Sequence, residues 1–149
     1  MTANEQHFQR DSWLSQRHRT WGLNAPAMDI DFLLIEYDNC TPKAIIDYKH
    51  ENSTINLNSA SARTLGKLGD MAAIPAYIVV YGHDQYDKNA LWSAPAPDAT
   101  HWFTVIPLND MAVKPHSNMI KIPELQYVDF LYKLRGRFMP ADLAWRLGQ

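Results

Sequence analysis

Four charged side chains have the types and spacing that could bind a metal ion and act on a phosphate. Asp47 and Lys49 lie two residues apart in an apolar run, 43–49, that predicts a strand, so both should project from one face. An earlier apolar run starts with Asp29 and Asp31, and a turn-forming stretch separates the two runs. The pattern predicts a hairpin in which these acids lie beside Asp47 and Lys49, because all four residues are remote from the turn.

Carboxylates that converge inside a sheet repel each other, and desolvating each one costs several kcal/mol unless a cation neutralises it. Oxygen ligands favour magnesium or manganese, and such an ion can activate a bound water and take up charge on a phosphate oxygen. Lys49 could orient that water or stabilise charge on the phosphorus. We therefore expect Mg²⁺ or Mn²⁺ at Asp31 and Asp47, with Asp29 as the alternative first ligand.

The elements that must position these residues follow from periodicity and capping signals. Strands are predicted at 28–37, 43–49, 76–81 and 102–108, and helices over the first twenty residues, from Asn58 or Ser59 to Met71, and at 124–135. A loop is predicted at 93–100. The order indicates an α/β class with a central mixed β-sheet flanked by α-helices, in a single domain over 1–149. We expect the acids of the turn, Glu36 and Asp38, to be solvated.

The hairpin resembles the signature of the PD-(D/E)XK nuclease superfamily, which is an acid at the start of one core strand and an acid-x-lysine triplet on the next. The triplet is Asp47-Tyr48-Lys49, and Asp31 precedes it by sixteen residues. The resemblance covers about residues 1 to 81. It implies a restriction-endonuclease-like core and an Mg²⁺-dependent phosphodiesterase. The chain departs from the family pattern in three ways: neither acid follows a proline, aspartate replaces the commoner glutamate, and no glutamine-tyrosine motif follows.

The same resemblance implies that Asp31, Asp47 and Lys49 are catalytic. Many members of the family add an acid from the leading helix, and Glu5 is the candidate here, with Asp11 second. A lone glutamate on a polar helix is more commonly solvated, and that alternative stays open for Glu5. For the Asp31, Asp47 and Lys49 set, the alternative is a hairpin whose charges all face water.

Charge is unevenly distributed along the chain. Residues 29–51 carry six acids against two bases, a net of −4, whereas residues 112–149 carry six bases against three acids, a net of +3. An acidic centre beside a basic tail fits a cation site next to a polyanion, although solvated surface charge is the commoner cause. We expect nucleic acid, DNA before RNA, to contact six residues: Arg10, Arg17, Arg63, Lys67, Arg135 and Arg137.

Composition sets the remaining expectations. Hydrophobic residues make up 46% and charged residues 20%, which is typical of a globular protein. The single Cys40 and the lack of a signal peptide favour a cytoplasmic setting, and no apolar run approaches the roughly 20 residues that cross a bilayer. The predicted function is hydrolysis of phosphodiester bonds in DNA or RNA, with a homodimer as one route to specificity. The alternative is a catalytically silent protein of nuclease fold that binds nucleic acid or a protein partner. Either would suit a phage or mobile element.

Overall fold

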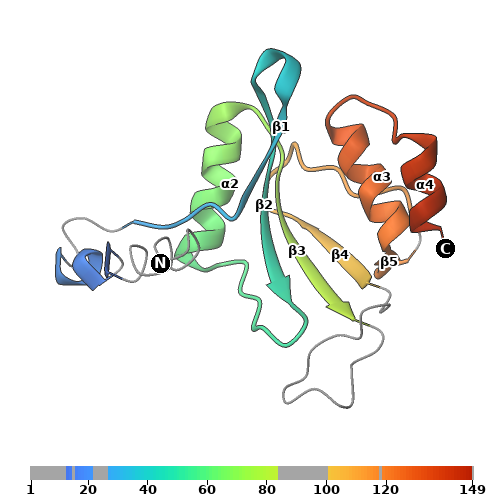
Figure 1. The fold of residues 1–149 in the computed structure, drawn as a ribbon. Helices are drawn as coiled ribbons and strands as arrows, with labels where there is room; N and C mark the ends of the chain where they lie inside the picture. Colours follow the sequence, from blue (N-terminus) through green and yellow to red (C-terminus); the bar gives the residue numbers. More distant parts are fainter. Residues whose placement is uncertain (1–12, 15, 22–26, 84–100, 118, 149) are drawn as a thin grey trace, which may run out of the picture.

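The computed structural model describes residues 13–14, 16–21, 27–83, 101–117 and 119–148 (Figure 1). In this part of the chain, strands form one mixed sheet in the order β1-β2-β3-β4-β5. The strands are β1 Phe32–Glu36, β2 Thr41–His50, β3 Ala76–His83, β4 His101–Pro107 and β5 Ile122–Pro123. The helices are α2 Ala60–Ala72, α3 Glu124–Leu134 and α4 Ala141–Leu147, and residues 13–14 and 16–21 are also helical. The predicted α/β class with a mixed sheet flanked by helices is confirmed.

The predicted hairpin forms from β1 and β2, which pair antiparallel through a short 3₁₀ turn at Tyr37–Asn39. Cys40 closes the turn in the left-handed region, at φ 54°. β1 is shorter than the strand predicted at 28–37. Its ladder with β2 starts at the pair Phe32 and Ile46, so Asp31 and Asp47 would form the next pair but lie outside the ladder. Like charges directly opposite each other weaken strand pairing, which gives a physical reason why β1 starts at Phe32 and not earlier.

β2 and β3 run parallel, and α2 makes the connection between them. The Ser59 Oγ accepts a hydrogen bond from the Ala62 N–H at 3.1 Å, so Ser59, one of the two predicted residues, caps the helix. Two glycines let α2 approach the sheet closely. A Cβ at Gly66 would lie 2.7 Å from the carbonyl oxygen of Leu108, and a Cβ at Gly69 would lie 2.8 Å from that of Ile74.

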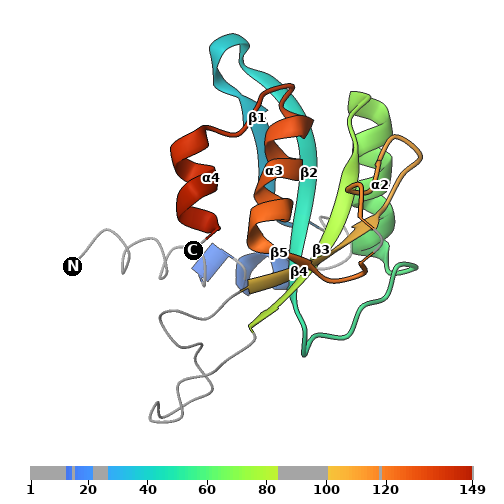
Figure 2. The same ribbon diagram turned by 90° about the vertical axis from the view of Figure 1, so that its right-hand side faces the viewer.

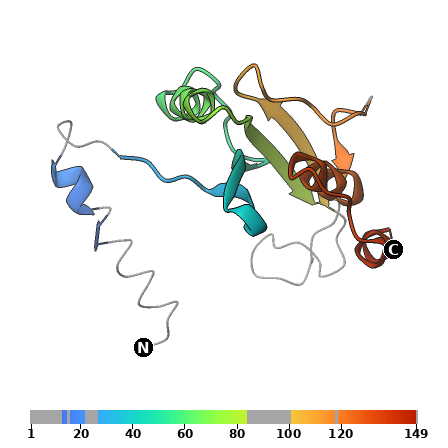
Figure 3. The ribbon, with the colours of Figure 1, turned by 90° about the horizontal axis from the view of Figure 1, so that it is seen from above.

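Helices cover both faces of the sheet (Figures 2 and 3). On one face, α2 contributes Leu65 to a small core with Ile45 and Ala76. On the other face, α3 packs over a larger core. That core consists of Ala44, Ile46, Tyr77, Val79, Val105, Ile122, Tyr127 and Phe130. Alternate residues of β2 therefore serve opposite cores, as the apolar character of both its faces predicts.

The C-terminal part of the chain begins with the helix predicted at 124–135, which runs from Glu124 to Leu134, and Gly136 follows it at φ 75°. The short elements β5 and α4 were not predicted. The loop expected at 93–100, and residues 1–12 of the leading helix, lie outside the described residues. Across the ranges that are described, no helix has both the length and the apolar character needed to span a bilayer.

Candidate functional site

The hairpin register brings Asp31 and Asp47 together. Phe32 is the Cα partner of Ile46, so extending the register by one residue places Asp31 opposite Asp47, just outside the ladder. The Asp31 carboxyl group lies close enough to that of Asp47 to raise the pKa of Asp47. The Asp47 side chain is only 16% exposed, whereas Asp31 is exposed. The pair thus joins one sheltered and one accessible carboxyl group.

Lys49 completes the group that the sequence predicts. Its Nζ lies 3.4 Å from the Oδ2 of Asp47, and its side chain is 41% exposed. Alternation along β2 places Ile45, Asp47 and Lys49 on one face, and Ile45 packs against α2. The three charged groups therefore lie on the α2 side of the sheet, beyond the small core.

The middle residue of the triplet anchors the strand from the opposite face. The Tyr48 hydroxyl hydrogen-bonds the Tyr127 hydroxyl of α3 at 2.5 Å, and the Tyr48 ring meets Phe32 edge to face at 4.9 Å between centroids. Tyr127 stacks on Phe103 at 4.2 Å, and burial raises its pKa, so the hydroxyl stays protonated. These contacts fix the backbone that carries Asp47 and Lys49.

The electrostatics of the pair favour a proton or a cation. Burial raises the pKa of Asp47, and the adjacent Asp31 carboxyl raises it further, while the Lys49 ammonium acts in the opposite direction. Two ionised carboxylates in contact are unfavourable unless positive charge is shared between them. A divalent ion would supply more of that charge than Lys49 alone.

The structure describes two carboxylates at this site and no third ligand. Among the described residues, no group of three or more His, Cys, Asp or Glu side chains could hold a metal ion. Asp29 is exposed and belongs to no such group, and Glu5 and Asp11 lie outside the described residues. Magnesium is commonly held by one or two carboxylates with water and substrate phosphate, so the donor set fits magnesium better than it fits a fully protein-ligated metal.

Beyond Lys49, this face of the sheet continues through residues that are not among the predicted site residues. Glu51 follows at the next position of the alternation and is half-buried. A Cβ at Gly82 would lie 2.5 Å from the Glu51 Oε2 and would also strike the Trp102 ring. The Lys121 Nζ lies 4.2 Å from the Trp102 ring centroid. The period of two in 45, 47, 49 and 51 is the signal that could have predicted the place of Glu51.

The residues expected to contact nucleic acid fall into two groups. Arg63 and Lys67 are exposed on α2, and Arg17 is exposed with its guanidinium 5.7 Å from the Trp13 ring centroid. Arg10 lies outside the described residues. Arg135 and Arg137 form the second group, and both pair with acids of this same chain.

The tip of the hairpin is joined to the segment after α3 by these ion pairs. Arg137 donates to both carboxylate oxygens of Glu36, at 2.9 and 3.2 Å, and also to Asp38. Arg135 lies 3.4 Å from Glu36. The Arg137 hydrogen bonds lower the pKa of Glu36. The expectation that Glu36 is solvated is wrong, because Glu36 is only 5% exposed. Residues about a hundred positions later in the chain fold against it. Asp38 is exposed, as expected.

Two cavities lie near the opposite edge of the sheet, with volumes of about 190 and 260 Å³, and neither is lined by Asp31, Asp47 or Lys49. The carboxylate pair therefore lies on an accessible face rather than in either of these cavities. No family model, curated protein or solved structure matches this chain.

Proposed function

We propose that this protein is a magnesium-dependent phosphodiesterase that hydrolyses nucleic acid, DNA before RNA, and that Asp31, Asp47 and Lys49 are its catalytic residues. One observation supports the proposal above all others. Asp31, just before β1, lies close enough to Asp47, in β2, to raise its pKa, and the Lys49 ammonium group lies 3.4 Å from Asp47. Carboxylates with a lysine on the same strand face are suited to phosphoryl chemistry.

Each residue has a distinct part in this proposal. Asp31 and Asp47 would hold the ion, and the ion, when bound, would lower the pKa of water and offset charge on a phosphate oxygen. Lys49, which is partly exposed, can leave Asp47 once the carboxylates are otherwise neutralised. Its ammonium can then hydrogen-bond the attacking water or a phosphate oxygen.

Substrate contacts would come from the α2 side of the sheet. Arg63 and Lys67 are exposed one turn apart on the helix that covers this side, so both can reach a phosphate backbone. Arg135 and Arg137 carry less of this role than the sequence alone suggests, because Glu36 and Asp38 already neutralise part of their charge.

Cleavage assays on four kinds of nucleic acid test the proposal. Wild type and Asp47→Asn are incubated with labelled single- and double-stranded DNA and RNA, with magnesium or with a chelator. We expect wild type to cleave at least one of the four substrates only when magnesium is present, and Asp47→Asn to be inactive. Asp129→Asn is the matched control, because Asp129 also pairs with a lysine, at 2.8 Å, but does so on the surface of α3.

A second candidate function is supported by the shortage of ligands. With two carboxylates described at the site, the protein could keep the nuclease-like hairpin and bind nucleic acid or a protein partner without turnover. A wild type that is inert on all four substrates and takes up no manganese in calorimetry would favour this candidate. Manganese uptake by wild type but not by Asp47→Asn would instead show that the metal site exists.

A further inference from the structure

The outer edge of β4 is open over half of its length. In the part of the chain that the structure describes, β5 pairs with Trp102 and Phe103 alone, so 104–107 has no neighbouring strand on that side. The Leu108 N–H donates to the Ala76 carbonyl at 2.8 Å, and this bond determines which residues of β4 direct their main-chain N–H and C=O groups toward β3. By alternation, Val105 directs its N–H and C=O away from β3. Among the described residues, this donor and this acceptor have no strand partner on that side, and Val105 as a whole is 7% exposed.

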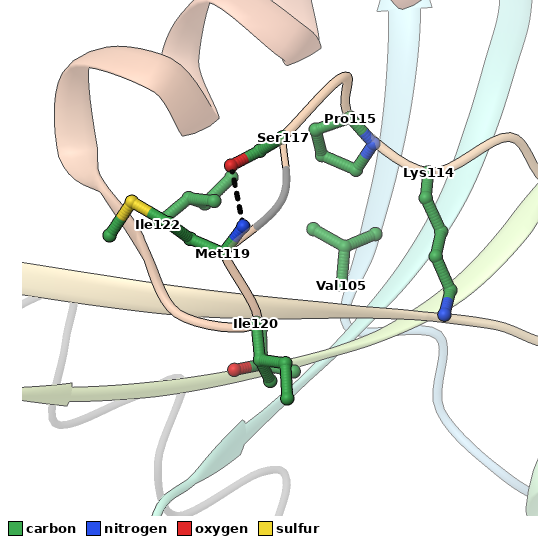
Figure 4. A pocket seen from close by; sticks show the side chains of 8 residues that line it. Val105, Lys114, Pro115, Ser117, Met119, Ile120 and Ile122 are labelled. Carbon is green, nitrogen blue, oxygen red and sulfur yellow. Dashed lines mark hydrogen bonds between the residues drawn. The ribbon is translucent and has the colours of Figure 1, made fainter.

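A cavity of about 190 Å³ lies beside this open edge (Figure 4). Val105 and Ile122 form part of its wall, and the segment that leads from β4 to β5 forms the rest. Ile120 is 81% exposed and Met119 is 58% exposed, so the rim is apolar and accessible. The cavity is smaller than the roughly 300–1,000 Å³ of a typical small-molecule site, which favours a single apolar side chain as its occupant.

The charge around the cavity is positive. Lys114 is the charged residue among those that line it, and no acid lines it. In Figure 4 the Lys114 side chain extends along one wall, on the side away from Met119. Lys121 adds a second positive charge near the β5 end, where its Nζ lies over Trp102. An occupant with acidic side chains would complement both lysines.

We propose that the open edge of β4 and its cavity bind an extended segment of a partner protein in which apolar and acidic residues alternate. The segment would pair with Val105 as an added strand, place an apolar side chain in the cavity and set an acid near Lys114. A second copy of this chain fits less well, because symmetric pairing would bring the Lys114 surfaces of both copies together. This binding site lies at the opposite edge of the sheet from β1 and does not depend on the proposed hydrolysis.

Fluorescence anisotropy with the full chain tests the proposal. The probes are three fluorescein-labelled peptides in which glutamate alternates with valine, leucine or phenylalanine. We expect saturable binding of at least one peptide, and its loss when alternate peptide amides are N-methylated or when lysine replaces glutamate. Lys114→Glu and Ile120→Glu should each weaken binding about tenfold, whereas Arg146→Glu, a similar charge reversal on exposed α4, should not.

Several results would overturn the inference. Equal affinity for the N-methylated peptide would show that the main chain of β4 takes no part. Unchanged affinity in both Lys114→Glu and Ile120→Glu would place binding elsewhere, and failure of all three peptides to bind at millimolar concentration would reject the site. Self-association in sedimentation that Ile120→Glu abolishes would assign the edge to a second copy instead.

Discussion

The side chain of Asp47 lies where its ionised form is unfavourable. It is largely sheltered by the sheet, it faces the Asp31 carboxyl group, and Lys49 compensates only from a partly exposed position. A group held in this way is destabilising when charged and becomes useful when a cation binds. If the proposed ion binds, the pair links metal binding to folding stability, and that link can be measured apart from catalysis.

The first prediction concerns the stability of Asp47→Asn in chelator. The pKa of Asp47 is higher in the folded chain than the ordinary value of 3.8, so the folded state binds more protons in this range. The free energy of unfolding of wild type should fall as pH rises from about 3.8 through the raised pKa, whereas the asparagine does not titrate. The stability of Asp47→Asn relative to wild type should therefore increase between about pH 3.5 and pH 8, as measured by urea unfolding.

Loss of the ion pair with Lys49 offsets part of this gain, by about 0–1 kcal/mol for a pair near the surface. Asp129→Asn serves as the control, because Asp129 is paired with Lys133 but faces no second acid. A stability difference that does not change with pH would contradict the assignment of repulsion at Asp47. Added magnesium should stabilise wild type and leave Asp47→Asn unchanged.

The second prediction assigns Lys49 a chemical role. If its ammonium orients water or stabilises phosphoryl charge, Lys49→Ala should retain manganese binding and lower the single-turnover rate roughly 10²-fold or more. If Lys49 only neutralises Asp47, the variant should bind metal at least as tightly and lose little rate. Single-turnover cleavage and calorimetry on the same preparation, with Lys133→Ala as the control, separate the two outcomes. An active Lys49→Ala would reject the catalytic role.

At the scale of the elements, the position of the site depends on how closely α2 approaches the sheet. Glycine inside a helix is normally unfavourable, yet Gly66 and Gly69 both lie on the buried face of α2. The backbone atoms of Leu108 and Ile74 occupy the space that a side chain would need. Close packing therefore explains why glycine occupies positions 66 and 69: each lets α2 lie against neighbouring backbone atoms.

The third prediction is that Gly66→Ala destabilises the protein despite its better helix propensity. Alanine should add about 1 kcal/mol of helix propensity, but overpacking against a backbone atom costs about 1–3 kcal/mol, because the Leu108 carbonyl cannot rotate away. The difference is a net loss of up to about 2 kcal/mol in chemical unfolding. Ser61→Ala, on the exposed face of α2, should be close to neutral. A stabilised Gly66→Ala would show that α2 can move away from the sheet at little cost.

At the scale of the whole molecule, the ion pairs of Glu36 connect the two ends of the described fold. Glu36 ends β1, and Arg137 lies between α3 and α4, 101 residues later. The contact holds the hairpin tip against the C-terminal helices on the α3 side of the sheet. Because Glu36 is 5% exposed, removing its partner leaves a carboxylate with little access to water.

The fourth prediction is that Arg137→Ala lowers the unfolding midpoint at neutral pH, and that Glu36→Gln combined with Arg137→Ala recovers part of the loss. The pKa of Glu36 is lowered from 4.5, so the stability it contributes is present above pH 4.5 and is lost as pH falls through the folded value. The difference between wild type and Arg137→Ala should therefore shrink in acid. Thermal unfolding from about pH 3 to pH 7 measures it.

The same variant addresses nucleic-acid binding. If Arg137 serves mainly to hold Glu36, Arg137→Ala should leave the salt dependence of nucleic-acid affinity unchanged, whereas Lys67→Ala should reduce the log-log slope by about one unit. If Arg137→Ala reduces the slope of affinity against salt in a folded protein, then Arg137 contacts the nucleic acid.

The sequence by itself determined the elements that depend on local signals. The alternation in β2 and the Ser59 cap are properties of short stretches, and each appears where it was predicted. The placement of an acid of the first strand near Asp47 also follows from local rules, because a hairpin with a short turn allows few registers. The sequence left open which of Asp29 and Asp31 faces Asp47.

Only the tertiary structure decided the features that join distant segments. The burial of Glu36 depends on Arg135 and Arg137, and the open edge of β4 depends on how far β5 extends along it. The shelter of Asp47, which raises its pKa, requires β3 to pair beside β2. Contacts of this kind are set by packing free energy summed over the whole chain, so no local pattern of residues encodes them.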